Sequence, residues 1–203
     1  MFLKKDRNII NWSLCIHYKN SNYLCSNLLL LQKETGMEFR RAEETDIANI
    51  MEIIKQAQDY FKKNGIDQWQ NQYPNTDTIK NDIKNGNSYV LVDEDNIVGT
   101  VAVVFTGEKT YENIYDGQWL SNGKYATIHR IAVESSRKGQ GVSKIILGFI
   151  EDMCAKMSIP SIKVDTHRNN LSMQRFLEKN GFQYCGIIYL EDKSERLAFE
   201  KVL

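Results

Sequence analysis

The chain has 203 residues, of which 42% are hydrophobic, and it carries 26 basic and 26 acidic side chains. This length and apolar content suffice for one soluble domain with a proper core. With no net charge, the sequence argues against nucleic acid or an anionic membrane as a partner.

Residues 1–36 differ from the rest of the chain. A few basic residues precede an apolar run, but polar residues such as Asn11 and His17 interrupt that run, so we expect neither a signal peptide nor a membrane span. We expect an N-terminal extension over 1–36, either poorly ordered or packed as a partner-binding arm, and one domain over 37–203.

From Glu38 onward, period-two and helical apolar patterns alternate, which is typical of an α/β domain. Thr45 is a candidate cap for the first helix, and Asn64-Gly65 is a candidate stop. The first half of the domain is predicted to contain a strand at 38–42, helices at 45–63 and 76–85, and a hairpin of strands at 88–92 and 97–105.

A polar connection over 107–124 leads to the second half. The predicted elements there are a strand at 127–133, a glycine-containing turn, a helix at 142–157, a strand at 161–165, a short helix from 170, and strands at 182–189 and 196–202. The whole order is β-α-α-β-β-β-α-β-α-β-β.

Gly139 and Gly141 lie where the strand ending at Val133 must turn sharply into the helix. Without a Cβ atom, glycine adopts positive φ easily and lets a ligand approach the peptide N–H groups. The first turn of the helix adds unpaired donors and the positive end of its dipole. The turn therefore predicts a site for an anion such as a pyrophosphate.

A second motif follows about thirty residues later, in Asn170-Leu-Ser-Met-Gln-Arg-Phe-Leu-Glu-Lys-Asn-Gly-Phe182. With this motif and the glycine turn, the chain over about 37–203 resembles the GCN5-related N-acetyltransferase (GNAT) superfamily. That superfamily has an acetyl-CoA loop of the form Arg/Gln-x-x-Gly-x-Gly/Ala, followed by Asn-x-x-Ala-x-x-(Leu/Phe)-Tyr-x-x-x-Gly-Phe. Lys138, Ser143 and Met173 depart mildly from these forms. Leu177 replaces a Tyr that is thought to protonate the departing thiolate in many members.

The resemblance implies the GNAT fold: a mixed, mostly antiparallel central sheet, splayed between two parallel middle strands, with helices on both faces. It implies acetyl-CoA as cofactor, with the pantetheine arm held by the backbone of Ile131 and Val133. Asn170 and Phe176 would approach the arm from the far side, although helix capping alone would explain Asn170. The pyrophosphate would lie against Lys138, Gly139, Gln140, Gly141, Val142 and Ser143.

The implied activity is transfer of an acetyl group to a primary amine of a small molecule or peptide by direct attack. Leu177, which has no proton to give, favours the alternative of a non-catalytic acyl-CoA-binding sensor or subunit. A Rossmann site is not favoured because Lys144 stands in place of the third glycine, and the Gly-Lys-Ser/Thr ending of a P-loop is missing.

The candidate general bases are histidines, whose ordinary pKa lies near neutral pH. His129 alternates with Ile131 and Val133, so on a regular strand it shares their face, and its short stretch resembles the arylalkylamine N-acetyltransferases. It could instead be a half-buried strand residue. His167 could pair with Asp165 on one face of an extended chain. The nearest candidate acids by fold position are the phenols of Tyr184 and Tyr189 and the thiol of Cys185, although both tyrosines could equally be packing residues.

Aromatic residues in polar loops are candidates for acceptor binding: Trp69 and Tyr73 before the second helix, and Trp119 in the connection. They could equally anchor these loops on the core. The four cysteines form no zinc motif, so we expect no metal site, reduced thiols and a cytoplasmic location. A homodimer is one possible assembly.

Overall fold

The structure is a computed structural model, and it describes residues 35–203. All but the last two residues of the expected extension at 1–36 lie outside this range. His17, Cys15 and Cys25 therefore also lie outside the described residues.

The described elements follow the predicted order. The first half contains β1 (Met37–Arg41), α2 (Ile47–Lys63), α3 (Thr76–Lys84), β2 (Ser88–Asp93) and β3 (Asn96–Val104). The second half contains β4 (Tyr125–Val133), α4 (Val142–Lys156), β5 (Ser161–Thr166), α5 (Leu171–Lys179), β6 (Gln183–Tyr189) and β7 (Glu195–Val202). The polar connection before β4 includes one short 3-10 helix, Lys109–Tyr111.

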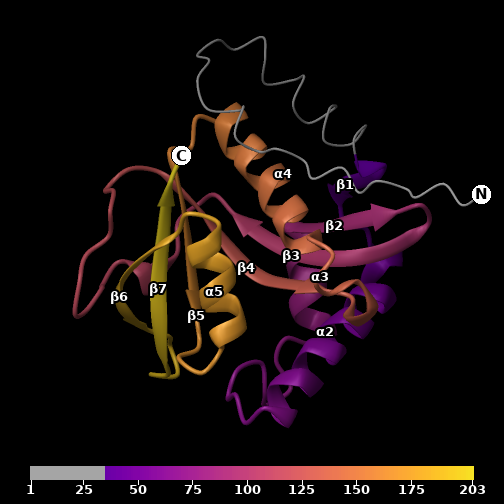
Figure 1. Cartoon of the computed structure of the whole chain (residues 1–203), viewed down its shortest axis with the longest axis horizontal. Helices are drawn as coiled ribbons and strands as arrows, with labels where there is room; N and C mark the ends of the chain where they lie inside the picture. Colours follow the sequence, from indigo (N-terminus) through magenta and orange to yellow (C-terminus); the bar gives the residue numbers. More distant parts are fainter. Residues whose placement is uncertain (1–34) are drawn as a thin grey trace, which may run out of the picture.

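The strands form one seven-stranded sheet in the order β1-β2-β3-β4-β5-β7-β6. Only β4 and β5 pair in parallel; the other neighbours in the sheet are antiparallel. The parallel pairing is short and runs from Tyr125 opposite Ser161 to Thr127 opposite Lys163. The predicted sheet, mostly antiparallel and splayed in the middle, is confirmed (Figure 1).

Helices cover both faces of the sheet (Figure 1). On one face, Phe149 and Ile150 of α4 pack in the main core with Ile128 of β4. On the other face, Ile54 of α2 and Val90 of β2 belong to a separate buried cluster. Because side chains point alternately to the two faces along each strand, the sheet has a core on each face. These two cores hold the sheet between the helix layers.

The start of α2 corrects one prediction, because Thr45 does not cap the helix. Thr45 lies inside a 3-10 turn, Glu44–Asp46, that leads into α2. The Asp46 carboxylate instead accepts the backbone N–H of Glu43 at 2.8 Å and two hydrogen bonds from the Arg40 guanidinium at 2.7 and 2.9 Å. Glu43 and Asp46 thus form a capping box at the start of the 3-10 turn, which leaves Thr45 inside the turn and not at the start of the helix.

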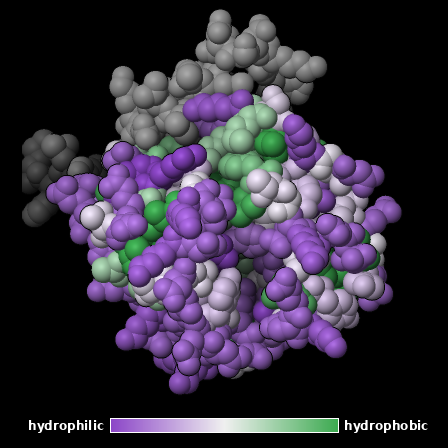
Figure 2. Space-filling model, turned by 180° about the vertical axis from the view of Figure 1, so that it is seen from behind, coloured by the Kyte–Doolittle hydropathy of each residue, from purple (hydrophilic) through white to green (hydrophobic). Residues whose placement is uncertain are grey.

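The part of the chain from 35 to 203 contains no helix long and apolar enough to cross a membrane. The face of the molecule in Figure 2 is mostly hydrophilic; its largest apolar patch lies in the upper half of the view, and smaller apolar areas lie to the left and the lower right.

Candidate active site

A gap opens in the sheet where β4 and β5 diverge. Among the described residues, no ladder pair joins the two strands beyond Thr127 and Lys163. β4 nevertheless stays paired with β3 as far as Val133, and β5 stays paired with β7 as far as Thr166. The backbone edges that face the gap can therefore pair with a peptide-like ligand, as expected for Ile131 and Val133.

A β-bulge interrupts β4 at the gap. Thr100 of β3 lies opposite Ala132, whereas Ala102 lies opposite His129, so two residues of β4, Arg130 and Ile131, face a single residue of β3. Arg130 has a φ of 52°. The bulge breaks the alternation of side chains along the strand.

The expectation that His129 shares a face with Ile131 and Val133 is therefore wrong. Ile128, Ile131 and Val133 all pack in or against the core beneath α4. His129, which follows Ile128 directly, points to the opposite face. The prediction assumed a regular strand, and the bulge shifts every later residue by one position.

On that opposite face, His129 meets Glu108. The His129 Nε2 atom lies 3.1 Å from Glu108 Oε2, and the two side chains are 19% and 28% exposed. This hydrogen bond lowers the pKa of Glu108 despite its partial burial. The backbone N–H of Glu108 donates to the Tyr125 hydroxyl at 3.1 Å, which anchors the residue. An ionised carboxylate thus orients a partly accessible imidazole.

Sequence reasoning missed Glu108. It lies 21 residues from His129 in a polar connection that holds several acidic residues. Only the path of the chain after β3 brings it to β4, and nothing in the local sequence distinguishes it from Glu112 or Asp116.

His167 does not form the expected pair with Asp165. The Tyr111 hydroxyl donates to Asp165 Oδ1 at 2.7 Å, and Arg196 Nε lies 3.9 Å from Oδ2, so other partners hold the carboxylate. The His167 Nδ1 atom accepts the backbone N–H of Asn169 at 3.1 Å. Burial, followed by the charge of Arg196, lowers the pKa of His167, which is therefore neutral near pH 7.

The glycine turn has the predicted backbone. Gly139 and Gly141 have φ values of 78° and 84°, and α4 begins directly after Gly141. A Cβ atom built on either glycine would meet no atom within 4 Å, so the space beside the turn is open. The side chain of Val142 is only 2% exposed and belongs to the core, which leaves its backbone alone to face a ligand. This open, donor-rich turn fits a pyrophosphate.

Three further residues of the predicted cofactor site differ in their surroundings. Lys138 is exposed, and its ammonium lies 4.8 Å from the centre of the Tyr60 ring on α2. Ser143 lies in the first turn of α4. Phe176 is half-buried and packs against the core beneath α4.

Asn170 caps α5, as the simpler interpretation predicted. Its Oδ1 accepts the backbone N–H of Met173 at 3.2 Å, and its Nδ2 donates to Gln68 Oε1 at 2.9 Å. The residue is 5% exposed. Leu177, about two helical turns further along α5, is 1% exposed in the main core, so its position packs the helix and supplies no acid.

Tyr184 lies away from the gap. It is on β6, the outer strand of the sheet, which β7 separates from β5. Its ring packs edge-on against Phe199 at a centroid distance of 5.7 Å, and the side chain is half exposed.

The three expected acceptor aromatics have different surroundings. Trp69 packs edge-on against Phe61 at 5.5 Å. Trp119 stacks on Tyr111 at 5.2 Å and donates its indole N–H to the Tyr111 carbonyl at 2.9 Å, so it helps to build a small core. Tyr73 is 44% exposed, and its hydroxyl accepts a hydrogen bond from Arg130. Of the three, Tyr73 offers the most accessible surface.

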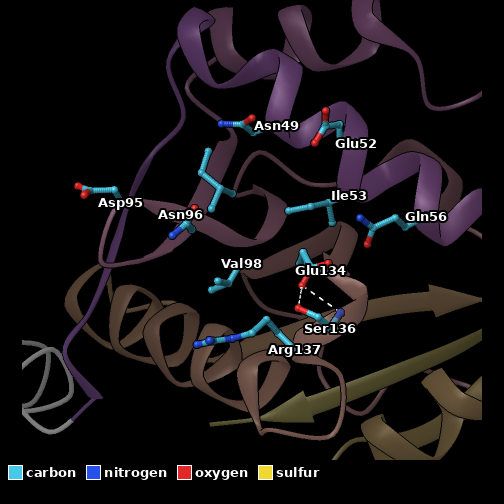
Figure 3. A pocket seen from close by; sticks show the side chains of 11 residues that line it. Asn49, Glu52, Ile53, Gln56, Asp95, Asn96, Val98, Glu134, Ser136 and Arg137 are labelled. Atoms are coloured by element: carbon cyan, nitrogen blue, oxygen red, sulfur yellow. Dashed lines mark hydrogen bonds between the residues drawn. The ribbon is translucent and has the colours of Figure 1, made fainter.

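A cavity of about 410 Å³ lies elsewhere, between α2 and the turn that joins β2 to β3 (Figure 3). Polar side chains dominate its lining, among them Glu52, Gln56 and Asp95. Within residues 35–203, none of the residues expected to catalyse or to bind cofactor or acceptor lines this cavity. It adjoins the connection between β4 and α4 through Glu134, Ser136 and Arg137, and we assign it no part in the reaction.

Comparisons with known proteins agree with the fold. The profile of the "Acetyltransferase (GNAT) family" matches residues 50–182. The chain is similar to a GNAT-family acetyltransferase of known structure from Streptococcus agalactiae, with 36% identity and a TM-score of 0.75 over 83% of this chain and 96% of that one. No curated protein sequence matches significantly.

Two further solved structures are similar at lower identity. One is a GNAT-family acetyltransferase from Listeria monocytogenes, with 22% identity and a TM-score of 0.65 over 82% of this chain and 95% of that one. The other is the paiA N-acetyltransferase of Thermoplasma acidophilum in complex with coenzyme A, with 16% identity and a TM-score of 0.62 over 82% and 99%. At these identities, the two structures bear on the fold alone. The family profile and the Streptococcus agalactiae protein carry the assignment: the chain belongs to the GNAT acetyltransferase family, whose members transfer an acetyl group from acetyl-CoA.

Proposed function

We propose that this acetyltransferase acts on a primary amine of a small molecule or peptide by direct attack, with His129 as the general base. The observation that carries the proposal is the His129–Glu108 pair, which lies on β4 beside the point where β4 and β5 diverge. A base in this position is the group that amide formation needs, because the attacking amine must lose a proton as the new bond forms.

The residues proposed to hold acetyl-CoA are those of the open turn and the gap. Backbone N–H groups of Gly139, Gly141 and Val142 would bind the pyrophosphate, and Lys138 would add a point charge. The free backbone edge of β4 at Ile131 and Val133 would pair with the pantetheine arm. When bound, acetyl-CoA supplies an activated acetyl thioester.

The hydrogen bond to Glu108 decides which nitrogen of His129 acts. Since the lowered pKa keeps Glu108 ionised at neutral pH, its carboxylate accepts the proton on Nε2. In the neutral imidazole, the lone pair then lies on Nδ1. We assign proton removal from the amine to His129 Nδ1, with Glu108 stabilising the imidazolium that forms.

His167 is less suited to this role. Its Nδ1 already accepts the backbone N–H of Asn169, so in the neutral ring Nε2 carries the proton. The lone pair needed for a base is therefore engaged. The lowered pKa of His167 also makes it the weaker base.

We infer that the reaction uses no dedicated acid at the position of Leu177. That side chain is buried in the core, and Tyr184 packs on the outer part of the sheet. A thiol has an ordinary pKa of about 8.5, so a thiolate leaves without obligatory protonation near neutral pH.

The test is release of free CoA with a panel of small amines and peptides with free N-termini. We expect His129→Ala to lower kcat/KM by roughly two to four orders of magnitude with little change in acetyl-CoA affinity, because a general base contributes about that much. His167→Ala is the matched control and should retain most of the rate.

The pH profile of the same reaction distinguishes the ionisation of the general base from that of the acceptor amine. In the wild type, kcat/KM should rise with pH through an apparent pKa that is missing in His129→Ala. The ionisation of the amine can cause a similar rise, so the profile is measured with two acceptors of different basicity. Retention of both rate and profile in His129→Ala would contradict the assignment. Binding of acetyl-CoA without CoA release across the panel would instead support the sensor alternative.

We also propose a cytoplasmic location. Cys154 and Cys185 are free and buried thiols in the described part of the chain, which suits a reducing compartment.

A further inference from the structure

Arg130 has a backbone conformation that residues with a side chain rarely adopt. Its φ of 52° lies in the left-handed region, at the point where two residues of β4 face Val101 of β3. A bulge that requires this conformation is usually formed with glycine, because a Cβ atom makes it strained. The arginine at this position therefore needs compensating contacts.

The compensating contacts come from α3. Arg130 Nε donates to Asp82 Oδ2 at 2.8 Å, and Nη2 donates to Oδ1 at 2.7 Å. The two side chains are only 13% and 8% exposed, so water screens the pair weakly. A two-point arginine–carboxylate pair also fixes the orientation of both groups. The bulge is thus attached to α3.

The same guanidinium reaches the loop between α2 and α3. Arg130 Nη1 donates to the Tyr73 hydroxyl at 2.9 Å. Earlier in this loop, Gln68 Oε1 accepts a hydrogen bond from Asn170 at the start of α5. The loop is therefore attached to β4 at one point and to α5 at another, and it bridges the two sides of the gap.

The bulge also carries the groups on which the proposed chemistry depends. His129 precedes Arg130, and Ile131, whose backbone faces the gap, follows it. We propose that Arg130 is a positioning residue for acetyl transfer. It fixes His129 relative to the backbone of Ile131, and it holds the loop between α2 and α3 through Tyr73. The proposal rests on the role proposed above for His129. Displacement of a reacting group by about 1 Å can cost on the order of 100-fold in rate.

Arg130→Gly is the most informative variant, because glycine keeps the left-handed backbone without strain and removes the guanidinium. We expect it to fold, to bind acetyl-CoA within about twofold of the wild type, and to lose about 10- to 100-fold in kcat. Arg130→Lys should lose less, since it keeps the charge but not the two-point contact. Tyr73→Phe should raise the KM for the acceptor more than it lowers kcat.

Arg40 provides a matched control, because it forms the same two-point pair with Asp46 at the start of α2. Arg40→Ala should lower Tm and leave kcat and both KM values unchanged. A second readout needs no turnover: the ring proton–carbon NMR resonances of His129 should move in Arg130→Gly and Arg130→Lys, but not in Arg40→Ala.

If Arg130→Gly fails to fold, Arg130→Lys and Asp82→Asn test the same contacts. Folded Arg130 variants that keep the wild-type kcat, KM and His129 resonances would overturn the proposal and leave Arg130 a purely structural residue. A wild type that releases no CoA with any amine would contradict the proposed function instead, while the NMR comparison still tests the link between Arg130 and His129.

Discussion

Gly141 combines a positive φ with open space beside it, and both properties predict that a larger residue at this position weakens ligand binding. Its φ is 84°, and a Cβ atom at this position would meet no atom of the protein within 4 Å. In Gly141→Val, the added side chain would occupy the space predicted for the pyrophosphate. We expect acetyl-CoA affinity to fall at least about tenfold, equivalent to about 1.4 kcal/mol, as measured by calorimetry.

Gly65 offers a matched control for this substitution. It has a φ of 65° and the same open surroundings, but it follows the C-terminus of α2. Gly65→Val should therefore lose a similar amount of stability and keep its acetyl-CoA affinity. Equal affinities of Gly141→Val and the wild type, with both proteins folded, would argue against a cofactor at the turn.

The residues whose role depends only on the local backbone were predictable from the sequence. The positive φ of Gly139 and the capping by Asn170 follow from the chemistry of those residues alone. Glu108 and Arg130 were not predictable as functional candidates, because each acquires its role through a partner distant in sequence.

The junction between β1 and α2 shows how one ion pair fixes the entry to a helix, and it gives a pH prediction. Hydrogen bonding from Arg40, the largest influence, lowers the pKa of Asp46 below its ordinary value of 3.8. A group with a lowered pKa stabilises the fold above its ordinary pKa, and that contribution is lost as the pH falls through the folded value. The stability supplied by Asp46 should therefore decline progressively as the pH falls below about 4.

Asp46→Asn tests this expectation through urea unfolding at several pH values. At pH 7, we expect the variant to be less stable than the wild type by about 1–2 kcal/mol, because it loses charged hydrogen bonds at a buried carboxylate. The difference should shrink as the pH falls from about 5 to 3. Asp59→Asn, at an exposed position on α2, serves as the control; a difference that stays constant with pH would contradict the linkage.

Among the elements, the order of strands and helices was predictable, whereas the bulge in β4 was not. Apolar periodicity in α2 and α4 and the continuous apolar runs of β2 and β3 are strong local signals. The bulge has no such signal, because an arginine occupies the left-handed position where glycine would have indicated it. As a result, the face assigned to His129 was wrong although the strand itself was correct.

In the whole molecule, the parallel ladder between β4 and β5 joins two halves of the sheet by only three residue pairs. Other contacts cross the same division. The buried Glu200 carboxylate of β7 accepts the backbone N–H of Leu120 at 2.7 Å, and the Lys163 ammonium of β5 lies 4.1 Å from the ring centres of both Trp119 and Tyr125. These contacts hold the two halves of the sheet together where β4 and β5 are paired. Beyond Thr127, the two strands stay apart. A ligand in the gap would join the two halves where the protein does not.

Acetyl-CoA should therefore stabilise the fold as a whole. At a concentration 100 times its Kd, a ligand that binds only the native state adds about 2.7 kcal/mol. For a chain of this size, each kcal/mol raises Tm by roughly 2–4 °C, so we expect a rise of about 5–10 °C in a thermal unfolding scan.

ATP and NAD should produce much smaller shifts at equal concentration. At the same concentration, Gly141→Val should lose at least about half of the shift, whereas His129→Ala should retain it, because the former alters the cofactor turn and the latter only the proposed base. Equal shifts in the wild type and Gly141→Val would mean that the stabilising ligand binds away from the gap and the turn.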